Sequence, residues 1–261
     1  MITKSLQRLI RQLDTKRGRL ESGMFLAEGP KVVAELWGHY ALSHLVVTTA
    51  WAESQEGRRL VGRCAPDQLT LVDDEELRRV SLLQHPQHLL ATFCMPSPPV
   101  REALDGLDDL TLALDGVQDP GNMGTIVRVA DWFGVRDIYC SADTCDIYNP
   151  KVVQATMGSI ARVRVHYLDL EGFVAALPDS IPVYGTSLQG ENIYAEPLAI
   201  PAVVVMGNEG RGVSAAVQEA CTRRLRIPSY ADSHETAESL NVAMATGIVL
   251  AEFRRQQSLT P

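Results

Sequence analysis

Residues 112–135, LALDGVQDPGNMGTIVRVADWFGV, decide the fold of the second half of this chain. An apolar run stops at the turn Asp-Pro-Gly-Asn-Met-Gly, and an apolar-periodic segment begins at once. Within that segment, apolar residues recur at the i, i+3, i+4 and i+7 spacing of a buried helix face: Ile126, Val129, Ala130 and Phe133. The stretch therefore predicts a strand, a turn and a helix. It resembles a nucleotide-binding unit but matches neither GxGxxG nor the Walker pattern.

The predicted helix covers residues 123–133, with Asn122 as its N-cap and Gly134 as its C-cap. Arg128 lies one residue from the buried face. It should leave the flank of the helix beside the cleft at the carboxyl ends of the strands, where open α/β sheets bind ligands. Taken alone, the same position favours a surface ion pair between Arg128 and Asp131 at i+3.

The composition is that of a globular protein, with 261 residues, 46% hydrophobic and 21% charged. The N-terminal stretch MITKSLQRLIRQLD lacks the apolar core of a signal peptide, and no apolar run is long enough to span a bilayer. We therefore expect a cytoplasmic protein that does not bind a membrane. The cysteines show no metal-ligand spacing, so we predict reduced thiols and no metal site: Cys64, Cys94, Cys140, Cys145 and Cys221.

The net charge of −8 argues at first against a nucleic-acid partner. Residues 1–20, however, contain six basic residues and one acidic residue, a local charge of +5. RNA binding requires a local basic surface rather than a basic chain. Lys16, Arg17 and Arg19 are therefore candidates for phosphate contacts, and a solvated helix face explains these residues equally well.

Three prolines within MPSPPV, residues 95–100, predict an extended linker. We place a domain boundary near residue 104, which gives domains 1–104 and 105–261. The first domain alternates predicted helices (3–13, 30–37, 52–60, 73–82) with predicted strands (24–29, 45–49, 69–73, 89–94), as in a small α/β domain.

The second domain alternates in the same way and predicts a parallel sheet with right-handed crossovers. The predicted strands are 110–114, 136–140, 162–166, 182–185, 202–206 and 224–227. The predicted helices are 123–133, 150–158, 170–176, 213–220 and 239–256.

A second distinctive turn lies in AVVVMGNEGRGVS, residues 202–214. A strand ends in Gly-Asn-Glu-Gly-Arg-Gly, where three glycines let the backbone bend and a ligand approach closely. The absence of GK[ST] argues against a P-loop. The loop offers backbone amides, backbone carbonyls and the carboxylate of Glu209, with Arg211 beside it.

A third block, RIPSYADSHETAESLNVAMATGIVLAEF, covers residues 226–253. A short strand leads through a polar connector to Ser239-Leu240-Asn241, which opens a long helix. Ser239 and Asn241 are good capping residues, and at i and i+2 they are also placed to point into a pocket. Small side chains would let this helix pack closely against a neighbour: Ala243, Ala245, Thr246 and Gly247.

Taken together, the three blocks resemble the SpoU (TrmH-type) RNA 2′-O-ribose methyltransferases of the SPOUT superfamily over residues 110–256. The stretch KRGRLESGMFLAEGPKVVAEL, residues 16–36, is similar to the family's N-terminal RNA substrate-binding module, which looks like a ribosomal-protein fold. The resemblance implies an α/β fold with a trefoil-knotted methyltransferase domain, a deep knot being a rare exception in proteins. It also implies S-adenosylmethionine as cofactor and a homodimer with helices 123–133 and 239–256 at the interface.

The resemblance further implies the site. The family's functional side chains match Asn122, Arg128, Glu209, Ser239 and Asn241. Its cofactor contacts, made largely through the backbone, match Thr186, Gly207, Ile227 and Leu240. Arg128 would stabilise the alkoxide that develops at the ribose hydroxyl, Asn122, Ser239 and Asn241 would orient Arg128 and the ribose, and Glu209 would fix its loop or position Arg128.

One segment departs from the family pattern. Ten residues, Ser229–Glu238, separate Pro228 from Ser239, a longer connector than the family usually has. Ser229 stands where methionine is usual. The longer connector would extend a lid or shift the adenosine pocket.

The predicted function is S-adenosylmethionine-dependent methylation of a ribose 2′-hydroxyl in RNA. The two-domain layout favours ribosomal RNA over transfer RNA by analogy. The alternatives are transfer-RNA ribose methylation and a non-catalytic RNA- or ribosome-binding protein on the same fold. A nucleotide-binding dehydrogenase or NTPase is disfavoured because both of their glycine-loop patterns are absent.

Overall fold

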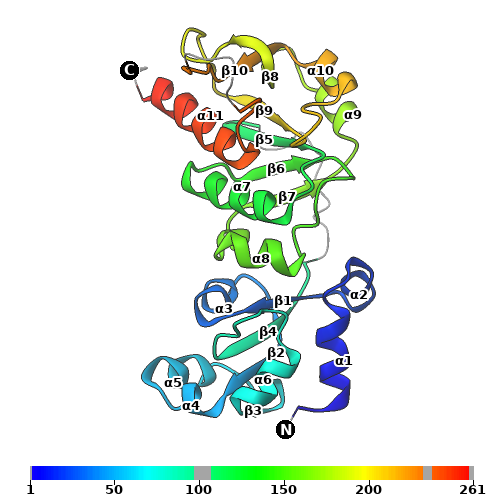
Figure 1. Ribbon diagram of the computed structural model, residues 1–261, viewed down its shortest axis with the longest axis vertical. Helices are drawn as coiled ribbons and strands as arrows, with labels where there is room; N and C mark the ends of the chain where they lie inside the picture. The colour runs from blue at the N-terminus through cyan, green and yellow to red at the C-terminus, as the bar shows by residue number, and fades with distance from the viewer. Residues whose placement is uncertain (1, 97–106, 232–236, 259–261) are drawn as a thin grey trace. The chain divides into compact units, whose positions relative to one another are not determined.

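The computed structural model describes residues 2–96, 107–231 and 237–258 (Figure 1). The chain forms two compact units, Met1–Pro99 with Asp146–Ala161, and Val100–Cys145 with Arg162–Pro261. The predicted boundary near residue 104 lies outside the described residues. Residues 146–161 belong to the first unit, although the residues on both sides of them in the sequence belong to the second. The sequence pattern did not predict this assignment. In the described ranges, no helix is long and apolar enough to cross a membrane.

The first unit contains a four-stranded sheet of order β1-β4-β2-β3. Strands β2 and β3 are parallel, and β4 runs antiparallel to both β1 and β2. The strands are β1 Met24–Glu28, β2 Leu42–Thr48, β3 Leu69–Val72 and β4 Leu89–Cys94. The helices are α1 Lys4–Gln12, α2 Lys16–Ser22, α3 Pro30–Leu36, α4 Thr49–Ala52, α5 Gln55–Val61, α6 Asp74–Val80 and α8 Pro150–Thr156. All predicted elements of this domain are present, the helix predicted at 52–60 is split into α4 and α5, and α2 was not predicted.

Helix α1 is amphipathic, and its apolar face joins the core of the first unit. Thr3 caps its N-terminus, with the Thr3 hydroxyl accepting from the backbone N–H of Leu6 at 3.3 Å. Ile10 and Leu13 are fully buried in a cluster with apolar residues of β1, β2, β4 and α6. The opposite, polar face of α1 is thereby held toward solvent.

Arg19 is buried in the corner between α1 and α2, with 2% of its side chain exposed. Its Nη1 donates to the carbonyl oxygens of Leu13 at 2.8 Å and Asp14 at 3.0 Å, and its Nη2 donates to Asp146 Oδ2 at 2.6 Å. The prediction that Arg19 contacts phosphate is therefore wrong, because its donors are used inside the fold. Arg17 is exposed but paired with Glu21 at 2.6 Å.

The second unit contains a six-stranded sheet of order β10-β8-β9-β5-β6-β7, and all of its strand pairs are parallel, as predicted. The strands are β5 Leu110–Asp115, β6 Asp137–Cys140, β7 Arg164–Tyr167, β8 Val183–Asn192, β9 Ala202–Gly207 and β10 Arg223–Arg226. The helices are α7 Pro120–Trp132, α9 Leu170–Ala175, α10 Ala215–Ala220 and α11 Val242–Gln257.

Helices cover both faces of this sheet. Helix α7 packs on α11, and α9 packs on α10. Figure 1 shows the first pair on one side of the sheet and the second pair on the other. The central strand β9 is buried along its whole length, as a parallel strand covered on both faces should be.

The N-terminus of α7 differs from the prediction. The N-cap is Asp119, whose carboxylate accepts from the backbone N–H of Asn122 at 2.8 Å, so the prediction of Asn122 as N-cap is wrong. Pro120 occupies the first helical position, where its missing N–H costs nothing. At the other end the C-cap is Phe133 and not the predicted Gly134, which follows it in the left-handed conformation with φ 71°.

The buried ion pair of Arg19 should dominate the stability of the first unit. Replacing one partner of a buried pair leaves an uncompensated charge, so we expect Asp146→Ala to lower the free energy of unfolding by about 3 kcal/mol. The matched control is Glu21→Ala, which breaks an exposed i,i+4 pair and should cost less than about 0.5 kcal/mol. Urea unfolding of both variants measures the difference, and equal midpoints would show that Arg19 does not need Asp146.

Candidate functional site

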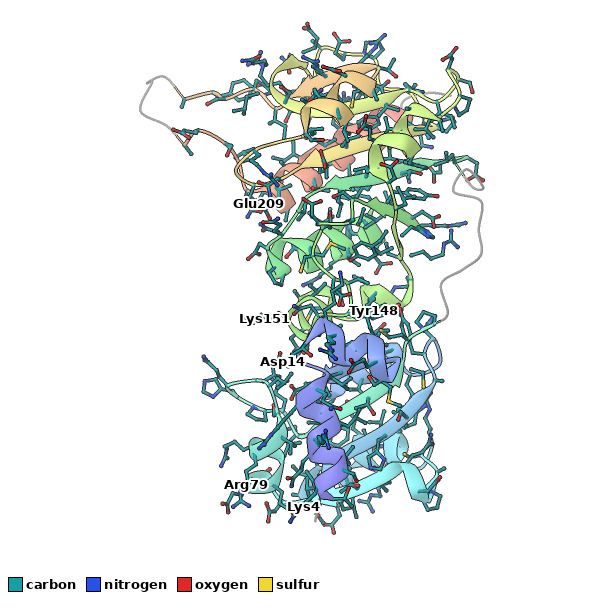
Figure 2. All side chains as sticks on the ribbon, turned by 90° about the vertical axis from the view of Figure 1, so that its right-hand side faces the viewer. Lys4, Asp14, Arg79, Tyr148, Lys151 and Glu209 are labelled. Carbon is teal, nitrogen blue, oxygen red and sulfur yellow. The ribbon has the colours of Figure 1, made fainter. Side chains whose placement is uncertain are left out.

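Three loops that are far apart in the sequence meet at one edge of the second sheet. Because β5, β8, β9 and β10 are parallel, their carboxyl ends lie at the same edge, where open α/β sheets bind ligands. The turn after β5 leads to α7, the glycine-rich loop follows β9, and the residues after β10 lead to α11. Figure 2 marks Glu209 among these loops.

The carboxylate of Glu209 joins the second loop to the start of α7. Glu209 Oε1 accepts from the side-chain Nδ2 of Asn122 at 2.9 Å and from the backbone N–H of Asp119 at 3.3 Å. Oε2 accepts from the backbone N–H of Gln118 at 3.4 Å. The negative charge also faces the positive end of the dipole of α7, which stabilises it there.

A second hydrogen bond extends this contact to α11. Asn241 Nδ2 donates to Asn122 Oδ1 at 2.8 Å, while Asn241 Oδ1 caps α11 by accepting from the N–H groups of Ala243 and Met244. An ionised carboxylate only accepts hydrogen bonds, so Asn122 must present its NH₂ group to Glu209. Asn122 then has only its oxygen left for Asn241. The hydrogen bonds therefore all donate in one direction, from Asn241 to Asn122 and from Asn122 to Glu209. This hydrogen-bonded chain, Glu209–Asn122–Asn241, connects all three loops.

Asn208 is a site residue that the sequence analysis did not single out. Its Nδ2 donates to the carbonyl oxygen of Gly116 at 2.7 Å, and its Oδ1 accepts from the N–H groups of Gly210 and Arg211 at 3.0 and 3.1 Å. The side chain thus holds the β9 loop in a tight turn and ties it to the turn after β5. The residue pair Gly-Asn before Glu209 was the available indication, since asparagine favours such turns.

The backbone of the loop after β9 passes so close to residue 207 that only glycine fits there. A Cβ atom at this position would lie 2.2 Å from the carbonyl carbon of Gly212 and 2.2 Å from the nitrogen of Val213. Any side chain here would displace the loop backbone. A substitution at Gly207 therefore tests the loop itself and not only ligand access.

A cavity of about 510 Å³ opens between the loops, within the range of small-ligand sites. Its wall contains all four residues predicted to contact the cofactor, namely Thr186, Gly207, Ile227 and Leu240. Glu209 and Ser239 line it as well. The remaining wall mixes apolar side chains with polar ones, among them Ile193, Met206, Leu225, Val242, Val249, Ser187 and Gln218.

The cavity suits S-adenosylmethionine, which combines an apolar base with polar ends. Gln218 also lines the cavity, and among the described residues its buried Nε2 makes no hydrogen bond. Thr186 is fixed by its hydroxyl, which donates to the carbonyl oxygen of Val205 at 2.9 Å.

Arg128 lies apart from the cavity wall on the exposed face of α7. Six residues, or about 9 Å of helix axis, separate it from Asn122. It forms no hydrogen bond or ion pair with any described residue. The alternative pairing with Asp131 is wrong, because Asp131 binds Arg162 at 2.9 Å instead. The structure thus brings Asn122, Glu209 and Asn241 together and leaves Arg128 free.

The connector before α11 is described only in part. Ser239 is exposed on the cavity wall and is not the N-cap of α11, a role that Asn241 fills. The segment ADSHET lies largely outside the described residues, so the predicted effect of the longer connector stays a prediction.

The cysteines are all free thiols, as expected. Cys221 lies next to Gly185. Burial raises the pKa of the Cys221 thiol to about 11, so it stays protonated near neutral pH. It is not activated as a nucleophile, because the thiolate is the reactive form.

The fold and the site define a two-unit α/β protein. The unit with the six-stranded parallel sheet holds the ligand cavity, and the other unit has a four-stranded sheet. The SpoU rRNA methylase family model matches residues 109–251, and the MRM3-like substrate-binding domain model matches residues 7–91. The chain belongs to the SpoU rRNA methylase family. The predicted family, enzyme class and cofactor are confirmed, and the trefoil knot stays a prediction.

Relatives match along nearly the whole chain. The 23S rRNA (guanosine(2553)-2′-O)-methyltransferase RlmP of Bacillus subtilis strain 168 is 31% identical over 246 residues, 94% of each chain. A TrmH-family protein from Porphyromonas gingivalis is 39% identical, with a TM-score of 0.85 over 98% of this chain and 99% of that one. The AdoMet-bound rRNA methyltransferase from Sinorhizobium meliloti is 30% identical, with a TM-score of 0.81 over 98% and 96%.

Removing the Glu209 carboxylate should loosen the loop that lines the cavity. We expect Glu209→Ala, which removes all three hydrogen bonds that anchor the loop, to weaken binding of S-adenosylhomocysteine at least about tenfold. Glu219→Ala on α10, outside the cavity wall, removes the same charge as a control and should leave the affinity unchanged. Isothermal titration calorimetry measures both constants, and an unaltered affinity for Glu209→Ala would contradict the loop-anchoring role.

Proposed function

We propose that this protein transfers a methyl group from S-adenosylmethionine to a ribose 2′-hydroxyl of ribosomal RNA. The observation that carries the proposal is the cavity whose wall contains Thr186, Gly207, Ile227 and Leu240 beside the Glu209–Asn122–Asn241 chain. The relatives named as 23S rRNA methyltransferases support ribosomal RNA over the transfer-RNA alternative. A ribosomal RNA substrate is consistent with the expected cytoplasmic enzyme.

When bound, S-adenosylmethionine supplies a methyl group activated by a sulfonium. The protein must then align the hydroxyl oxygen with the carbon and favour a more anionic oxygen. Alignment alone contributes up to roughly 7–11 kcal/mol to lowering a barrier. We assign it to the three anchored loops, with Ser239 and the Asn122–Asn241 pair facing the ribose.

Arg128 is the proposed group that stabilises the developing alkoxide. Arginine stays protonated in proteins, so it acts as a charge and hydrogen-bond donor and not as a base. A free guanidinium without an acidic partner suits this role, because no protein carboxylate competes for it. The hydroxyl proton leaves to an RNA phosphate or to water.

A homodimer completes the proposed site. In one chain Arg128 does not reach the cavity wall, and it shares the exposed face of α7 with Trp132, whose side chain is 85% exposed. On α11, which packs on α7, Met244 is 64% exposed. Large exposed apolar side chains mark interaction surfaces. A two-fold axis at this face would carry Arg128 to the partner's cavity.

Replacing Arg128 should separate binding from chemistry. We expect Arg128→Ala to keep the wild-type affinity for S-adenosylhomocysteine and to lose about 100-fold in kcat, the usual cost of one transition-state charge donor. Arg136→Ala, an exposed arginine in the turn after α7, serves as the control and should keep full activity. Transfer of tritiated methyl groups to undermethylated ribosomal RNA measures turnover, and near-normal turnover of Arg128→Ala would refute the assignment.

Mixed dimers test whether Arg128 acts across the interface. Ser187→Trp should fill the cavity and be inactive by itself, as should Arg128→Ala. If Arg128 serves the partner's cavity, a mixed dimer contains one intact site, and co-refolding the two inactive variants should restore about a quarter of wild-type activity. Absence of any recovery, with mixed dimers verified by differential tags, would place Arg128 and cavity in the same chain.

A further inference from the structure

The polar face of α1 carries a row of unpaired cations. Lys4, Arg8 and Arg11 are exposed, and none of them bonds to another described residue. Nearby arginines differ, because Arg17 on α2 and Arg79 on α6 each pair with a glutamate one turn away.

These cations border a shallow hollow of about 420 Å³ along the helix. Gln7, Gln12 and Thr15 complete its lining, so neutral hydrogen-bonding groups lie beside the charges. Within the part of the chain that the structure describes, no carboxylate lines it. In Figure 2, α1 faces the viewer, with Lys4 near its first turn and Asp14 beyond its last.

The spacing fits a polyanion that runs along the helix. Lys4, Arg8 and Arg11 are four and three residues apart and cover about 10 Å of helix axis. Along the axis of a B-form duplex, each strand presents about three phosphates over that length. Neutral side chains beside basic ones are typical of contacts to phosphate and sugar oxygens.

The fold also holds this face rigidly. Ile10 and Leu13 on the opposite side are fully buried in the core. The buried guanidinium of Arg19 binds the carbonyl oxygens of Leu13 and Asp14, which fixes the C-terminal end of α1. Preorganised charges lose less entropy on binding than mobile ones.

We propose that the Lys4–Arg8–Arg11 face of α1 is a phosphate-binding groove for the backbone of the RNA substrate. The inference rests on the proposed function for the identity of the polyanion. It replaces Arg19 as a source of phosphate contacts in the N-terminal segment. The groove supplies affinity without base specificity, because phosphates carry no sequence information.

The test compares two triple variants of the full-length protein. Lys4→Ala/Arg8→Ala/Arg11→Ala removes the groove charges, and Lys31→Ala/Arg58→Ala/Arg59→Ala removes the same number of exposed, unpaired charges from α3 and α5 of the same unit. Filter binding of unmodified 23S rRNA transcripts is measured from about 0.05 to 0.2 M KCl. We expect the α1 triple variant to reduce the slope of log Kd against log salt by about 2, at about 0.7 for each lost phosphate contact.

Methylation assays with the same RNA complete the test. The α1 triple variant should raise KM for RNA about tenfold, with kcat and S-adenosylhomocysteine affinity unchanged, whereas the control triple variant should change none of these values. An unaltered slope, an equal change in both triple variants, or a fall in kcat alone overturns the groove. If the wild-type protein methylates no RNA, the proposed function fails, and the binding slopes still decide whether α1 holds phosphate.

Discussion

The site depends on one constraint, that the Glu209 carboxylate accepts hydrogen bonds and cannot donate them. Because of it, Asn122 is turned with its NH₂ group toward Glu209 and its oxygen toward Asn241. Asn241 then uses its own oxygen to cap α11. Three backbone segments separated by up to 119 residues in sequence are thus joined through two side-chain bonds whose direction is set by a single charge. A neutral glutamine at this position would permit either direction and would not specify one arrangement.

The parallel sheet brings the three loops to one edge, and the hydrogen bonds then fix their positions there. Antiparallel neighbours would send alternate loops to opposite edges, whereas parallel strands return every loop to one edge. β5 and β9 are paired along their length, with Asp115 opposite Gly207 at their last registered pair. The turn after β5 and the loop after β9 therefore start side by side. This placement lets Asn208 reach the carbonyl oxygen of Gly116 at 2.7 Å and lets Glu209 reach the start of α7.

Periodicity and turn chemistry predicted every strand of both sheets, because alternation and apolar runs report burial that the fold then satisfies. What they did not predict depends on partners far along the chain. Arg19 seemed a surface cation because its buried partner, Asp146, lies 127 residues away. Asn122 seemed a cap because the local pattern does not distinguish it from Asp119 three residues earlier. The cofactor wall was predicted through family resemblance, since glycine-rich turns alone specify no ligand, and Asn208 and Gln218 were missed for the same reason.

A net charge of −8 is compatible with a basic RNA-binding face, because salt screens the interaction between charges that are far apart. At physiological salt the Debye length is about 8 Å, so a phosphate on α1 responds mainly to charges within that distance, among them Lys4, Arg8 and Arg11. The two units then contribute to the reaction through different forces. Contacts of α1 to phosphate weaken steeply with salt. Hydrogen bonds in the Glu209–Asn122–Asn241 chain form within the protein over about 3 Å and release no counterions, so they depend less on salt. The response of each kinetic constant to salt therefore distinguishes docking of the RNA from alignment of the ribose.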